Sequence, residues 1–119
     1  MTRSARFALV AVGLSLIAVR SAAQEIYTPE QDLDCAVITA IVSGQANDEE
    51  KSGLGVLLAH FVGLYEGKTG KVIDEAMATR AAAMTAQQAQ LLIQPCQRRS
   101  VAFAERLQAL GRRMTAQGN

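Results

Sequence analysis

The chain contains two cysteines, Cys35 and Cys96, and any fold must accommodate both. An even number of cysteines in a small domain predicts a disulfide when the protein matures in an oxidising compartment. Two alternatives are weaker. No Cys-x-x-Cys motif is present for redox catalysis, and a metal site on both cysteines and His60, the single histidine, lacks a clear fourth ligand. We therefore expect a Cys35–Cys96 bridge and neither a metal nor a cofactor.

The first residues have the pattern of a secretory signal peptide. Arg3 and Arg6 precede a mostly apolar stretch at residues 7–19, and residues 21–23 supply the small side chains that cleavage requires. A helix of that length rises about 20 Å, which is short of the roughly 30 Å hydrocarbon core of a bilayer. We predict a cleaved signal peptide at residues 1–23 and a single domain at residues 24–119. Its location would be the periplasm or the exterior, with no stable membrane anchor after cleavage.

Charge is almost balanced over the whole chain but divided along it. The chain has 12 basic and 11 acidic residues, a net charge of +1, which offers no electrostatic argument for nucleic acid. After residue 23, ten of the acids lie before residue 76, whereas residues 76–119 hold six arginines against Glu105 alone. Either the two halves pack together and compensate each other, or a dipolar surface steers a charged partner.

Apolar periodicity and capping residues predict an all-α fold of four to five helices, with the disulfide joining the first and the last. Thr28 and Pro29 begin the first helix, and the apolar run at residues 33–42 makes it the most buried one. Asn47 begins a second helix that ends near Gly67, and a third runs from Gly70 or Lys71 to Met84. Thr85 begins a fourth, which Pro95 breaks or kinks, and residues 96–114 form the last.

Two side-chain patterns predict helix packing. Small residues at Gly55, Ala59 and Gly63 would let another helix approach the second one closely, or they would line a ligand site. On the last helix, one side carries the apolar residues, and we expect it to form a buried seam with the disulfide. That side consists of Cys96, Phe103, Leu107, Leu110 and Met114, with Arg99, Arg106 and Arg113 in a row beside it.

Candidate partner-binding residues are Arg80, the three arginines of that row and His60. Arg80 falls on an otherwise apolar face, so it either pairs with a carboxylate of the acidic half or binds an anion. Arg99, Arg106 and Arg113 either flank a packed helix or dock onto an acidic partner. The amphipathic last helix, taken as an isolated peptide, would also suit a membrane surface.

Enzymatic chemistry has little support in the sequence. His60 has no evident nucleophile near it, so a surface or interface role is the better interpretation. Gly67, Lys68 and Thr69 lack the glycine at position 62 that a phosphate-binding loop needs, because Val62 stands there. No acid spacing requires paired acid–base work, and aromatic residues are too few to line a carbohydrate cleft. We therefore expect that the protein has no enzymatic activity.

A resemblance follows from Cys35 in the leading helix, the Phe-Val-Gly-Leu-Tyr-Glu-Gly segment at residues 61–67, and a Thr85-led helix that reaches Cys96. The chain resembles small uncharacterised two-cysteine helical proteins exported by Gram-negative bacteria. It is also similar in size, helicity and single bridge to the periplasmic acid-stress chaperones, which implies client binding when acid exposes apolar surface. The Gly-Leu-Tyr-Glu-Gly stretch resembles immunity proteins that neutralise secreted toxins. No individual residue role carries over.

Together these features predict an exported, non-enzymatic helical protein that acts through protein–protein contacts and is chaperone-like. The alternative is an immunity or inhibitor protein that neutralises a secreted toxin or hydrolase. The identity of the partner and the oligomeric state are left open.

Overall fold

Four helices make up the described part of the chain. The computed structural model describes residues 26–118, which form α1 (Pro29–Gln45), α2 (Asp48–Thr69), α3 (Asp74–Ala83) and α4 (Ala86–Gln117), with no strand among them. The all-α prediction is confirmed, with four helices. The expected signal peptide at residues 1–23 lies outside the described residues. Between residues 26 and 118, no helix has the length and apolar character needed to cross a membrane.

The predicted helix starts at Thr28, Asn47 and Thr85 are confirmed by individual hydrogen bonds. Thr28 and Thr85 each form a capping box, in which the threonine hydroxyl accepts from the backbone N–H of the residue three positions later. The side chains of those residues, Gln31 and Gln88, accept in return from the cap N–H. The Asn47 side chain accepts from the backbone N–H of Glu50 and caps α2.

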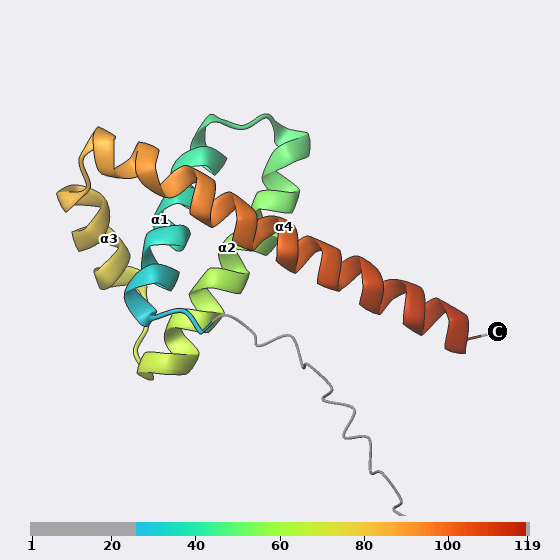
Figure 1. Ribbon diagram of the computed structural model, residues 1–119. Coiled ribbons are helices and arrows are strands. Elements are labelled where there is room, and N and C mark those ends of the chain that lie inside the picture. The colour runs from blue at the N-terminus through green and yellow to red at the C-terminus, as the bar shows by residue number, and fades with distance from the viewer. Residues whose placement is uncertain (1–25, 119) are drawn as a thin grey trace, which may run out of the picture.

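α1 is the central helix. It contacts α2, α3 and α4, and Figure 1 shows it between α2 and α3 with α4 crossing over. Buried side chains of α1 pack with Phe61 of α2, Ile73 ahead of α3 and Cys96 of α4 to form one core. The expectation that the first helix is the most buried is confirmed, because most of the buried residues belong to it.

The disulfide joins the first helix to the last, as predicted. Cys35 and Cys96 are bonded, both sulfurs belong to the buried core, and the bridge spans 61 positions of the chain. Within α1, the buried Thr39 hydroxyl donates to the Cys35 carbonyl at 2.7 Å, so this buried polar side chain is satisfied inside the helix.

The second and third helices have boundaries that differ from the expected ones. α2 continues past Gly67 to Thr69 and is capped by Gly70, whose φ of 67° is the left-handed conformation that glycine adopts most readily. α3 begins at Asp74 rather than near residue 70, because the chain needs residues 70–73 to turn and to bury Ile73.

Pro95 neither breaks nor ends a helix, so the two expected C-terminal helices are one. α4 runs without interruption from Ala86 to Gln117. Proline removes the N–H that would bond the carbonyl of Leu91. Leu91 is 71% exposed, so water can satisfy the freed carbonyl. The helix therefore tolerates the proline.

The expected burial of the apolar side of α4 is observed only between Cys96 and Phe103. Cys96 is buried and Phe103 is half-buried, but Leu107, Leu110 and Met114 are 42%, 50% and 64% exposed. Figure 1 shows the reason: the C-terminal half of α4 extends away from the other three helices, so no described element covers it. The prediction that the whole seam packs into the core is wrong.

The small residues of α2 do not receive a neighbouring helix either. A Cβ atom added at Gly55 or Gly63 would meet no heavy atom within 4 Å. The predicted close approach to this stripe is therefore absent from the described chain. α1 packs on a different face of α2, through residues such as Leu58 and Phe61.

Removal of the disulfide tests how much of this fold depends on it. A bridge closing 61 residues reduces the entropy of the unfolded chain, so we expect the Cys35→Ser/Cys96→Ser variant to lose about 4 kcal/mol of unfolding free energy. Urea denaturation monitored by circular dichroism measures the loss. A loss below about 1 kcal/mol would show that the helices hold together without the bridge.

Candidate functional site

A buried carboxylate connects three helices at the centre of the molecule. Asp32, in the first turn of α1, has no exposed surface. One of its oxygens accepts from Lys68 Nζ of α2, and the other accepts from the Arg99 guanidinium of α4. Lys68 also donates to the backbone carbonyl of Tyr27 at 2.9 Å. A charge removed from water is stable only when it is paired and hydrogen-bonded, and here both oxygens are occupied.

Arg99 is the most enclosed of the candidate arginines. Its guanidinium carbon lies 3.7 Å from the centre of the Tyr27 ring and 5.0 Å from that of Phe61. It also donates to the Gln31 carbonyl at 3.3 Å. These contacts and the Asp32 pair hold Arg99 beside the disulfide, where its Nη1 lies 3.6 Å from Cys35 Sγ.

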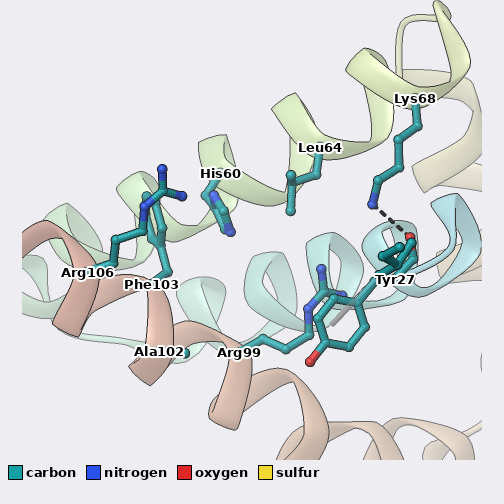
Figure 2. Close-up of a pocket in the computed structure, with 9 residues that line it drawn as sticks. Tyr27, His60, Leu64, Lys68, Arg99, Ala102, Phe103 and Arg106 are labelled. Atoms are coloured by element: carbon teal, nitrogen blue, oxygen red, sulfur yellow. Dashed lines mark hydrogen bonds between the residues drawn. The ribbon is translucent and has the colours of Figure 1, made fainter. Parts of the chain in front are cut away.

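A groove separates α2 from α4 on the side of the Asp32 cluster (Figure 2). It encloses about 540 Å³ and opens to solvent. Lys68, Leu64 and His60 line it from α2, whereas α4 contributes Arg99 and Arg106. We call this hollow the α2–α4 groove, and its lining is completed by Ile26, Tyr27, Ala102 and Phe103.

His60 closes one end of the α2–α4 groove by stacking on Phe103. The ring centres are 3.7 Å apart and the planes differ by 13°. Burial lowers the pKa of His60, and the charges of Arg99 and Arg106 lower it further, while Asp32 acts in the opposite direction. The imidazole is therefore neutral at neutral pH and serves as an aromatic surface. The positive charge at this end of the groove belongs to Arg106.

The structure brings together three of the five candidate binding residues. Arg99, Arg106 and His60 share the α2–α4 groove, whereas Arg113 lies farther along the projecting part of α4. Arg80 is apart from them, because its Nε donates to Asp34 of α1 at 2.5 Å. That hydrogen bond and the charge of Asp34 raise the pKa of Arg80 above its ordinary value.

The Arg80–Asp34 and Arg99–Asp32 pairs join the acidic first half of the chain to the basic second half. The compensation of charge between the halves is thus confirmed for these two arginines. It does not extend to Arg106 and Arg113, since no carboxylate of residues 26–118 lies within ion-pair distance of either.

Beyond the groove, α4 presents an exposed apolar row with arginines on one edge. We call this surface the α4 stripe: Leu107, Leu110 and Met114 with Arg106 and Arg113. An uncovered apolar row on an otherwise polar helix is typical of a contact surface for another molecule. It is continuous with the groove, because Arg106 belongs to both.

Sequence reasoning missed Asp32, Lys68 and Tyr27 as members of the central cluster. Asp32 interrupts the start of a nearly all-apolar helix, and a carboxylate in that setting is a signal for a buried ion pair. Nothing in the sequence indicated which cations would pair with it. Within the described chain, no three His, Cys, Asp or Glu side chains gather as a metal site would require.

Comparison with known proteins gives no match to a family model, to a curated protein or to a solved structure. We therefore infer the function from the geometry of the α2–α4 groove and the α4 stripe.

The Asp32 cluster predicts unequal effects of two similar substitutions. Asp32→Asn removes the charge that pairs Lys68 and Arg99, and we expect it to cost about 3–5 kcal/mol because a buried cation is left unpaired. Asp34→Asn, in the same helix, breaks the more accessible pair with Arg80 and should cost about 1 kcal/mol or less. Urea unfolding of both variants measures the difference. Equal losses would mean that Asp32 does not hold the helices together.

Proposed function

We propose that this is an exported, non-enzymatic helical protein that captures other proteins through the α4 stripe. The observation that carries the proposal is the exposure of Leu107, Leu110 and Met114 on a helix that no described element covers. Exposed apolar residues scattered singly are common on protein surfaces, but a contiguous row on one side of a projecting helix is a mark of an interaction site.

The attachment of α4 supports this interpretation. α4 is attached to α1 at two positions, the Cys35–Cys96 bridge and the Arg99–Asp32 ion pair, which lie one helical turn apart. A helix anchored at two points holds its projecting half in a defined direction, which lowers the entropic cost of ordering a contact surface when a partner binds.

Export is part of the proposal and has two supports. The charged, apolar and small-residue segments at residues 1–23 have the order of a signal peptide. The disulfide suits an oxidising compartment such as the periplasm or the cell exterior.

The acid-stress version of the proposal has support in the ion pairs. Asp32 and Asp34 of α1 provide the carboxylates that link it to α2, α3 and α4. Breaking these pairs would remove the ionic links between α1 and the other three helices. Loosening of these links, while the disulfide still joins α1 to α4, would expose further apolar surface for unfolding clients.

Client protection at low pH tests this function. At pH 2–3 the purified protein should bind an apolar fluorescent dye and suppress the aggregation of an acid-sensitive client, measured by light scattering. The Leu107→Ser/Leu110→Ser variant should protect several-fold less, because it removes the centre of the α4 stripe. The matched control is Val101→Ser, which removes a residue that is 51% exposed on a different side of α4.

Absence of both dye binding and protection at pH 2–3 would reject the chaperone version. The inhibitor version would then be tested by a cross-linking pull-down from periplasm. Recovery of one tight partner that the Leu107→Ser/Leu110→Ser variant loses would support it. A partner retained by that variant would reject the α4 stripe as the binding surface.

A further inference from the structure

We propose that the α4 stripe pairs side by side with a helix of its protein partner that carries acidic residues along one edge. The inference rests on the proposed function and names the partner's chemistry. It follows from the spacing, the charge and the open edge of the projecting half of α4.

The apolar row has the spacing of a coiled-coil seam. Phe103, Leu107, Leu110 and Met114 are separated by four, three and four positions, which is the alternation that places one side chain per turn toward a second helix. Phe103 is occupied by its stack on His60, so the seam open to a partner begins at Leu107. The remaining length, residues 107–117, accommodates about one and a half heptads of a partner helix.

The two edges of this seam differ in character. Arg106 and Arg113 lie along one edge, seven positions apart, and neither has a carboxylate within ion-pair distance among residues 26–118. The other edge has Ala104 and Gly111, and a Cβ added at Gly111 would meet nothing within 4 Å. Edge charges of coiled coils select the partner. A helix with acids facing the arginine edge complements one side, and the small residues admit its backbone on the other.

The same edges disfavour pairing of α4 with α4 of a second copy. An antiparallel pair would set arginine edge against arginine edge, where like charges repel. A parallel pair would set the arginines against Ala104 and Gly111, which supply no charge. A membrane-surface helix carries its cations over its polar face. On α4, Arg106 and Arg113 border one side of the seam, whereas Arg98 and Arg112 lie on the opposite, polar face, so the vesicle assay described below separates a lipid surface from a partner helix.

A binding assay with charge-matched peptides tests the inference on the full mature protein. The probes are two synthetic amphipathic helices of about three heptads with identical leucine seams, one with glutamate and one with lysine at the flanking positions. Fluorescence anisotropy at low and at physiological salt should show binding of the glutamate peptide at least about tenfold tighter than that of the lysine peptide, with the difference reduced by salt.

Charge reversal on α4 provides the matched variants. Arg106→Glu/Arg113→Glu should lose at least about tenfold in affinity for the glutamate peptide and gain affinity for the lysine peptide. Arg98→Glu/Arg112→Glu makes the same change of charge on the same helix, one position away from the row of Arg99, Arg106 and Arg113, and should change either affinity less than about threefold. Circular dichroism checks that both variants keep their helix content.

Several outcomes would overturn the inference. They are equal binding of the two peptides, equal effects of the two double variants, concentration-dependent self-association through the α4 stripe, and binding to anionic phospholipid vesicles in place of either peptide. If Leu107→Ser/Leu110→Ser abolishes client capture while the charge of the peptide has no effect on binding, the inference of an acidic partner helix is rejected and the proposed function stands. If that variant captures clients normally, the proposed function itself fails.

Discussion

The buried carboxylate of Asp32 is the interaction on which the arrangement of the helices depends. A carboxylate with no exposed surface requires cationic partners, and Lys68 and Arg99 can reach it only if α2 and α4 pack against the first turn of α1. A buried ion pair adds little stability compared with well-packed apolar residues, but removing one partner leaves an uncompensated buried charge. Here the pair selects which turn of α4 lies on α1.

The disulfide also fixes how α4 lies on α1, one helical turn away from the ion pair. Cys35 lies three positions after Asp32 on α1, and Cys96 lies three positions before Arg99 on α4, so the covalent link and the ionic link join the same two helix faces. Two attachments at neighbouring turns prevent α4 from sliding or rotating on α1. Because both lie near residues 96–99 of a helix that ends at Gln117, the later turns of α4 extend past the edge of the core.

The parts of this fold that local chemistry determines could be predicted from the sequence. Thr28, Asn47 and Thr85 begin helices because their side chains accept backbone hydrogen bonds nearby, and the disulfide follows from a single pair of cysteines. For Arg80 the sequence allowed two roles, a pair with a carboxylate of the acidic half or the binding of an anion, and the pair with Asp34 is the one observed. The stop at Gly70 instead of Gly67 and the continuity through Pro95 depend on where the chain turns and where water reaches, which a local pattern does not show.

The candidate site was only partly predictable for a related reason. The row of apolar residues from Phe103 to Met114 is the same in sequence whether a core covers it or not, and its exposure depends on where α4 is anchored. His60 and Phe103 stack across two helices, and Lys68 meets Asp32 across 36 positions of the chain. Such contacts form only when distant segments of the chain pack together. The sequence could therefore indicate Arg106 as a binding residue, but it could not indicate the groove that Arg106 borders.

α4 is attached to α1 at residues 96–99, and its last turns have no packing partner among the described residues. Native-state hydrogen exchange, measured residue by residue on the isolated protein, reports this difference along the helix. We expect backbone amides of α1 and of residues 96–103 to exchange only when the whole protein unfolds, and amides of residues 107–117 to be protected roughly a hundredfold less. Uniform protection from residue 96 to residue 117 would show that the end of α4 is as well supported as its attached part.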